Sequence, residues 1–145
     1  MESVFRLDLV SPTLAESFRR ASSAKRRQAA VVACELAASS ADLAGREIGL
    51  ALDALRSGTA GQLDLRQRLE GLVAHFDDEY LRLDEDGDES KKFETLRLFS
   101  KARAVSALAL ALTDDPGQLH EAIYEAIVAL DDPGELVRAV ENELR

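Results

Sequence analysis

The chain has one cysteine, no tryptophan and few glycines or prolines, and each shortage narrows the range of folds. Because Cys34 has no partner, an intramolecular disulfide is excluded and nothing indicates an oxidising compartment. Eight glycines and three prolines in 145 residues are few for a β-sandwich or barrel. Aromatic residues make up 5% of the chain, and its apolar content is mostly Ala, Leu and Val. The composition favours one all-helical domain, spanning 1–145, that is long enough to bury a core.

From the sequence we expect neither a signal peptide nor a membrane span. No apolar run approaches the ~18 residues of a membrane span, and Met1–Arg6 has no basic region followed by an apolar one. We therefore expect a cytoplasmic protein with no membrane partner. A Gly-rich phosphate loop, a Gly-x-Ser-x-Gly elbow and a Cys-x-x-Cys pair are all missing, so we expect neither catalysis nor a cofactor.

The formal charge of −9 is unevenly distributed. Residues 1–60 carry a net charge of +1, whereas residues 61–145 carry −10. Such a chain repels nucleic acid over most of its surface. Its acidic half is expected to attract a basic protein, and salt should weaken that attraction.

The two halves of the chain correspond in their apolar pattern. Stretch 25–38 matches 99–112 at a shift of 74 residues, and 48–55 matches 123–130 at a shift of 75. In the first pair, Ala30, Val31, Ala33, Leu36 and Ala37 recur as Ala104, Val105, Ala107, Leu110 and Ala111. Two helical segments in the same order, each with its apolar phase retained, predict a duplicated helical unit.

We therefore predict an all-α helical bundle, or a short α-α superhelix, of about six to seven helices. Two pseudo-repeated three-helix units, at about 13–83 and 91–145, are joined by an acidic junction at 84–90. The segment 13–40 contains neither Gly nor Pro, and it forms either one long helix or two helices broken near Ser22.

The N-terminal segment has a different pattern. Residues 4–10 alternate between apolar and charged side chains, which predicts a short extended arm. Ser11 and Pro12 then begin the first helix, where Thr13 and Glu16 fit a capping box.

A second helix-start signal occurs twice near the C-terminus. Asp-Asp-Pro-Gly stands at 114–117 and at 131–134, with Asp at the N-cap and Pro at the first helical position. These signals predict helices at about 117–130 and 133–144.

Short paired helices joined by Asp-Pro turns, with Val137-Arg138 near a helix start, resemble HEAT-type α-α repeats. The resemblance covers 101–145 best and 25–56 less well. It implies a protein-binding scaffold and transfers no functional residue. The period of about 75 differs from the ~40 residues of that class. The composition, rich in Ala, Arg, Leu and Asp, is typical of bacterial proteins of high GC content.

Metal-binding chemistry is present at one helix face, where His75, Asp78 and Glu79 are spaced i, i+3 and i+4. With His120 from another helix, they form the candidate site of a metal- or ligand-binding bundle enzyme. The Glu-x-x-His order of di-metal bundles is absent from both helices.

The acidic junction does not form an EF-hand, although Asp84, Asp86 and Asp88 alternate as calcium ligands do. Glu89 stands where the loop needs Gly, and Thr95 stands where it needs the bidentate Glu. The junction is therefore interpreted as a solvated loop, with weak divalent-ion binding as the alternative.

Cys34 and a cluster of five basic residues are each expected to have a structural role. Cys34 lies on an apolar helix and is expected to be buried rather than nucleophilic. The cluster lacks interleaved aromatic residues, so we expect it to face solvent or to pair with acidic residues of the same chain, such as those of 77–89. Its members are Arg19, Arg20, Lys25, Arg26 and Arg27.

The functional hypothesis is a non-enzymatic helical module that binds another protein through its acidic segment. The candidate contact residues are Asp77, Asp78, Glu79, Asp84, Glu85, Asp86, Asp88 and Glu89. In its sharpest form, the protein is an inhibitor or immunity-type protein that neutralises a basic bacterial toxin. The alternatives are the bundle enzyme described above and a homo-oligomeric regulatory adaptor, in its simplest form a homodimer, whose apolar faces meet.

Overall fold

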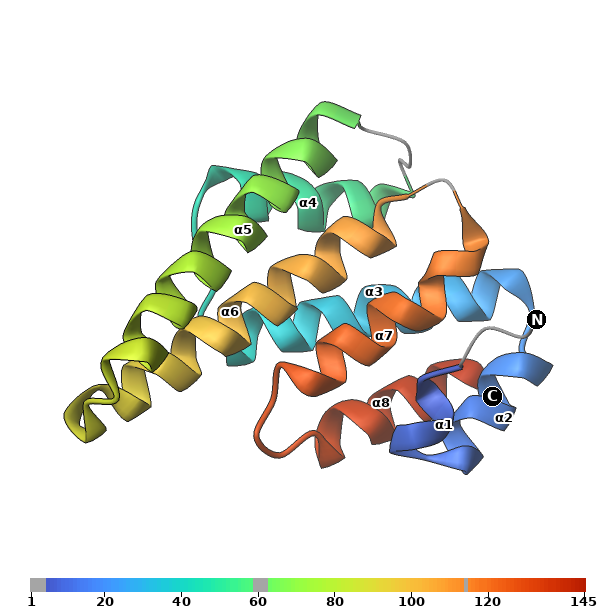
Figure 1. Cartoon of the computed structure of the whole chain (residues 1–145). Coiled ribbons are helices and arrows are strands. Elements are labelled where there is room, and N and C mark those ends of the chain that lie inside the picture. Colours follow the sequence, from blue (N-terminus) through green and yellow to red (C-terminus); the bar gives the residue numbers. More distant parts are fainter. Residues whose placement is uncertain (1–4, 59–62, 114) are drawn as a thin grey trace, which may run out of the picture.

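The computed structural model describes residues 5–58, 63–113 and 115–145, and within them it confirms the all-α prediction (Figure 1). Eight α-helices are joined by loops, with 3-10 turns at Glu89–Lys91 and Pro116–Gln118, and these described residues form no strand. The helices are α1 (Leu7–Val10), α2 (Pro12–Arg20), α3 (Ser23–Ser40), α4 (Arg46–Ser57), α5 (Leu63–Asp86), α6 (Lys92–Ala111), α7 (Leu119–Val128) and α8 (Gly134–Leu144).

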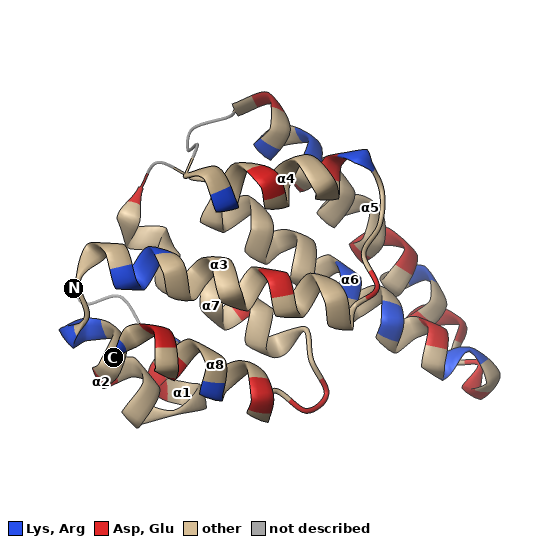
Figure 2. Cartoon of the chain, turned by 180° about the vertical axis from the view of Figure 1, so that it is seen from behind, with Lys and Arg blue, Asp and Glu red and all other residues tan. Residues whose placement is uncertain are grey.

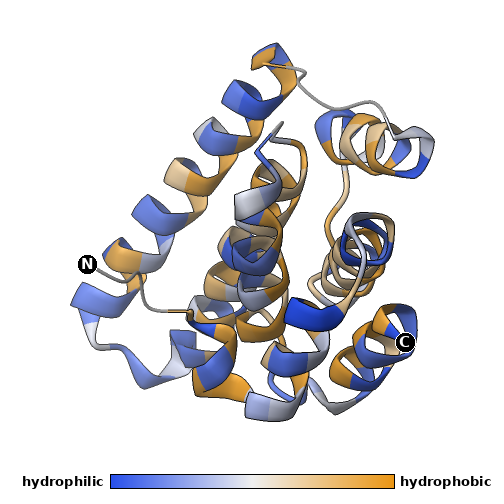
Figure 3. Cartoon of the chain, turned by 90° about the vertical axis from the view of Figure 1, so that its right-hand side faces the viewer, coloured by the Kyte–Doolittle hydropathy of each residue, from blue (hydrophilic) through white to orange (hydrophobic). Residues whose placement is uncertain are grey.

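Three helices form the centre of the bundle: α3, α6 and α7 each pack against the other two (Figure 1). On one side α5 lies along α6, and α4 contacts both. On the other side α8 packs against α3, and α1 and α2 complete the bundle beside α7 and α8. The surrounding helices carry hydrophilic residues on their outer sides (Figure 3).

Alanine is the commonest buried residue of the central helices. The separation of packed helices depends on the side chains at the contact, so methyl groups allow a close approach. Larger residues such as Leu108, Ile123 and Leu136 fill the remaining space and are fully buried. The buried alanines of the three helices are Ala29, Ala30, Ala33, Ala37, Ala38, Ala102, Ala104, Ala107, Ala109, Ala111, Ala122 and Ala126.

The prediction of an extended N-terminal arm is wrong for the described part of 4–10, because residues Leu7–Val10 form one helical turn. In a strand, Leu7 and Leu9 would lie on the same face. In the helix they point in nearly opposite directions, so Leu7 is fully buried while Leu9 is 73% exposed. Val4 lies outside the described residues.

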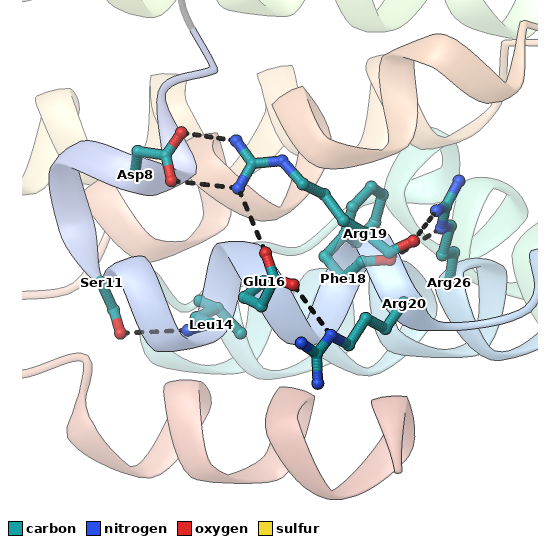
Figure 4. A network of polar contacts seen from close by, with 8 residues as sticks. All are labelled: Asp8, Ser11, Leu14, Glu16, Phe18, Arg19, Arg20 and Arg26. Carbon is teal, nitrogen blue, oxygen red and sulfur yellow. Dashed lines mark hydrogen bonds and ion pairs between the residues drawn. The ribbon is translucent and has the colours of Figure 1, made fainter.

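Helix α2 begins where the sequence indicates, but its cap is Ser11 rather than Thr13. The Ser11 hydroxyl accepts a hydrogen bond from the Leu14 backbone N–H at 3.2 Å (Figure 4). Glu16 therefore has no capping role, and its carboxylate instead accepts a 2.8 Å hydrogen bond from Arg20. The capping-box prediction fails because Ser11, with Pro12 following at the first helical position, caps the helix two residues earlier.

The segment 13–40 is two helices rather than one. The chain is extended at Ala21 and Ser22, and the Ser22 hydroxyl accepts a hydrogen bond from the Lys25 N–H at 3.3 Å. Arg26 holds the corner, since its Nε donates to the Phe18 carbonyl oxygen at 2.8 Å (Figure 4). A cation of α3 thus binds the free carbonyl end of α2, as a helix C-terminus favours.

Both Asp-Pro signals mark helix starts. The Asp115 carboxylate accepts the Gly117 N–H at 2.9 Å, ahead of the 3-10 turn that leads into α7. The Asp132 carboxylate accepts the Gly134 N–H at 3.1 Å, at the first residue of α8. Asp114 lies outside the described residues.

Within the described residues, no helix combines the length and the apolar character needed to cross a membrane.

Because the central helices approach closely, a larger side chain at their contact should destabilise the protein. Ala107 is fully buried on α6, so Ala107→Leu should overpack the centre and lower the free energy of unfolding by about 1–3 kcal/mol in urea titration. Ala74→Leu adds the same side chain at an exposed position of α5 and should change the stability little. Equal effects of the two substitutions would contradict a tightly packed centre.

Candidate functional site

Helices α5 and α6 form a long antiparallel hairpin whose tip projects beyond the other helices (Figure 1). The fully buried residues of α5 are Leu65 and Leu69, both in its first two turns. Towards the tip the two helices are held by half-buried side chains, among them Tyr80 and Phe99, whose ring centroids lie 5.6 Å apart. The distal half of the hairpin is therefore thinly packed and exposes two helix surfaces to solvent.

The tip is a tight turn, so only part of the solvated loop predicted at 84–90 is a loop. Helix α5 continues to Asp86, and Gly87 reverses the chain with φ of +63°. The Asp88 carboxylate then accepts hydrogen bonds from the Ser90 hydroxyl at 2.8 Å and the Ser90 N–H at 3.0 Å. These bonds favour the charged form and lower the pKa of Asp88.

The eight acidic candidate residues fall into two groups, according to whether their carboxylates make contacts within the chain. Four are exposed at or near the tip with no ion pair among the described residues: Asp78, Asp84, Glu85 and Glu89. The other four make contacts within the chain. Glu79 lies 3.7 Å from Arg82, and Asp86 lies 3.5 Å from Lys91. Asp88 caps the turn, and Asp77 contacts Arg103 of α6.

Asp77 belongs to a charged network at the base of the hairpin. Arg103 of α6 contacts the Asp77 carboxylate of α5 at 3.2 Å and the Glu125 carboxylate of α7 at 3.0 Å. Ser106 also donates to Glu125, at 3.2 Å. Glu125 is only 7% exposed, so the guanidinium compensates a carboxylate that has lost most of its water. One side chain thus ties together three helices.

Apolar side chains are exposed on the same hairpin. The exposed fractions are 74% for Phe93, 48% for Leu96 and 54% for Leu81. Phe93 and Leu96 lie in the first two turns of α6, outside the core. Both precede the part of α6 where buried residues become frequent, from Ala102 onward.

The four residues of the metal hypothesis lie on two helices, three on α5 and one on α7. His75 and Asp78 are exposed on α5 and Glu79 is half-buried there, whereas His120 lies in the first turn of α7 among Phe5 and Phe18. Among the described residues, no three His, Cys, Asp or Glu side chains are grouped so that they could hold a metal ion.

His120 is part of an aromatic cluster that holds the N-terminal helices on α7. Its ring centroid lies 4.5 Å from that of Phe5 and 6.2 Å from that of Phe18. Burial lowers the pKa of His120, and the nearby Arg6 acts in the same direction. Arg6 pairs with Glu121 and stacks 4.1 Å above the Tyr124 ring.

The basic cluster pairs within the chain, but with acids other than those of 77–89 for the pairs the structure describes. Arg19 binds Asp8 at 2.6 Å, and Arg20 binds Glu16 at 2.8 Å (Figure 4). Lys25 donates to the backbone oxygen of Arg145. The cluster stabilises the N-terminal helices, because its acidic partners are close in sequence and on neighbouring turns.

Cys34 is fully buried in α3, as predicted. Burial is the main reason that its pKa rises to about 12, and Glu35 adds to the effect. A thiol in this state is protonated and inaccessible at neutral pH, which excludes it as a nucleophile.

No protein-family model matches this sequence, and neither a curated protein nor a solved structure matches the chain.

The network at Arg103 makes a stability prediction. Arg103→Met leaves Glu125 buried without its cation and should lower the free energy of unfolding by about 3–5 kcal/mol in urea titration. The double variant Arg103→Met with Glu125→Leu removes the stranded carboxylate, so it should be more stable than the single variant. A double variant as unstable as Arg103→Met would show that the arginine acts through packing alone.

The buried thiol of Cys34 should make the free energy of unfolding depend on pH in the alkaline range. This thiol holds a proton up to about pH 12 in the folded protein, whereas an unfolded thiol ionises near pH ~8.5. Rising pH therefore favours the unfolded state. Between pH ~8.5 and ~10 the wild type should lose about 1.5 kcal/mol more unfolding free energy than Cys34→Ala, measured in urea. Parallel pH profiles would contradict the buried, protonated thiol.

Proposed function

We propose that this protein is a non-enzymatic module that binds a basic protein partner at the tip of the α5–α6 hairpin. The observation that supports this most directly is the projecting hairpin (Figure 1), which carries exposed carboxylates and exposed apolar side chains. Charged groups that are free of internal partners remain available to an incoming protein, and nearby apolar surface supplies short-range attraction.

The electrostatics favour a basic partner. Residues 61–145 carry a net charge of −10, and the hairpin tip concentrates acidic residues of that half (Figure 2). A field of one sign accelerates the approach of an oppositely charged protein, and the effect weakens as salt screens it. In its sharpest form the proposal is an inhibitor or immunity-type protein directed against a basic toxin.

The thin packing of the distal hairpin also suits a binding role. Surfaces that adjust to a partner belong to regions of low local stability, which have few buried contacts. Beyond Leu69, the described residues of α5 are at most half-buried, so the tip can shift slightly without disturbing the core.

We also propose that the two halves of the chain arose by duplication of one helical unit, as the sequence predicts. The support for this duplication is the match of α3 with α6 and of α4 with α7 in apolar phase. Helix α6 packs extensively on α7, whereas α3 and α4 contact each other much less. We infer that the two halves diverged in packing after a duplication, and the likeness to HEAT-type helix pairs rests on the same pattern.

The proposal is tested by removing the tip charges that have no internal partner. The triple variant Asp84→Asn, Glu85→Gln, Glu89→Gln should associate about tenfold more slowly with the natural partner at low salt, with a flatter salt dependence. The partner is first identified by capturing it from the native lysate at low and high salt. Association is then followed by stopped-flow fluorescence.

A matched control separates local from global charge. The variant Asp64→Asn, Glu70→Gln, Glu135→Gln changes three other exposed acids, so its net charge shifts by the same amount. It should keep the wild-type association rate to within about twofold. Equal slowing in both variants would mean that net charge alone matters, and no slowing in either would overturn the proposed function.

A further inference from the structure

A groove lies along the N-terminal half of α6, where this helix leaves the bundle. Its walls are the Phe93 and Leu96 side chains of α6, the end of α3 at Ala41 and Asp42, and the α7–α8 connection at Leu130 and Asp131. It encloses about 400 Å³. This volume is within the range of binding pockets for small molecules and single side chains.

The α6 wall of the groove is one face of the helix, and other helices bury this face along only part of its length. Phe93, Leu96 and Ser100 are spaced i, i+3 and i+7, so they share one face. The same face continues to Ala104 and Ala107, both of which are fully buried in the bundle. Beyond Ser100 towards the tip, Phe93 is 74% exposed and Leu96 is 48% exposed. The packing surface of the core therefore extends past the point where α3 ends at Ser40.

We propose that this groove binds an amphipathic α-helix of a basic partner, with apolar residues against Phe93 and Leu96 and flanking Lys or Arg near the acidic rim. The inference rests on the proposed function and names the partner's binding element. A helix is favoured over an extended strand because the apolar wall is a face of helix α6 and the described residues offer no sheet edge. An apolar helix face laid beside α6 would continue the layer that Ala104 and Ala107 bury.

The charge of the rim determines the chemistry of the occupant. Three carboxylates of the described lining, those of Asp42, Asp131 and Asp132, stand against one guanidinium, that of Arg97. Lys or Arg side chains beside the apolar face of an incoming helix would meet this rim. A second copy of the chain fits poorly, because each copy carries −9 and the acidic surfaces would repel.

The proposal is tested with a defined probe, a Leu/Lys peptide of about 15 residues with every leucine on one helical face. A control peptide has the same composition but alternates Leu and Lys, so it has no apolar helical face. The full ¹⁵N-labelled chain is titrated with each peptide and followed by amide chemical shifts. The first peptide should shift resonances of 40–42, 93–100 and 129–132 and bind more tightly than the control.

Two pairs of variants test the contacts. Phe93→Ser with Leu96→Ser should raise the Kd for the first peptide about tenfold, whereas Leu9→Ser, 73% exposed on α1, should leave it within about twofold. Asp42→Asn with Asp131→Asn should weaken binding and flatten its salt dependence, whereas Asp64→Asn with Glu70→Gln should not. Asn tolerates the φ of +55° at Asp42, so the backbone there is preserved.

The outcomes separate this inference from the proposed function. Shifts confined to residues 84–89, or a Kd unchanged by the Phe93 and Leu96 substitutions, would overturn the groove while leaving the acidic tip as a binding surface. Groove shifts that grow with protein concentration in the absence of peptide would overturn it in favour of self-association. Failure of the tip variant to slow the natural partner is read separately and would overturn the proposed function.

Discussion

The unequal lengths of α6 and α7 determine which helix surfaces this molecule leaves exposed. Helix α6 has 20 residues and α7 has 10, so at 1.5 Å per residue they span about 30 and 15 Å. Close packing through alanine fixes the C-terminal half of α6 against α3 and α7. Its N-terminal half must then leave the bundle, with α5 as its main companion. Both the projecting hairpin and the uncovered face at Phe93 and Leu96 follow from this mismatch.

The Arg103 network lies at the base of the hairpin, where it helps to fix the direction in which the hairpin projects. Burying an ion pair costs desolvation free energy that its Coulombic attraction repays only with good geometry. Here Arg103 meets two carboxylates on different helices, Asp77 and Glu125, and the second also accepts from Ser106. A network of this kind specifies which faces of α5, α6 and α7 meet. It contributes to the register of the hairpin more than to the net stability.

Features that depend on residues close together in the sequence, such as helix caps, could be predicted. Features that depend on contacts between distant residues could not. Ser11-Pro12 and the two Asp-Pro turns mark helix starts because each cap uses residues two or three positions apart. The segment around Leu7 is too short for its period to be diagnostic, since alternation over a few residues also fits a single helical turn. Phe93 looks like a core residue because periodicity shows a face, not where the neighbouring helix ends. The partnership of Arg103 with Glu125 spans 22 residues and two helices, and no pattern along the chain reveals it.

In the proposed function, the acidic tip and the apolar groove would act on different steps of one association. Charge acts at a distance of about 10 Å in 0.1 M salt, so the tip would set how often a basic partner arrives in a useful orientation. Apolar contact acts only when surfaces touch and water is expelled, so the groove would set how long the partner stays. Because both lie on one projecting hairpin, the proposal separates the arrival of a partner from its retention. Salt should therefore lower the association rate more than it raises the dissociation rate, unless the rim at Asp42 and Asp131 carries most of the attraction.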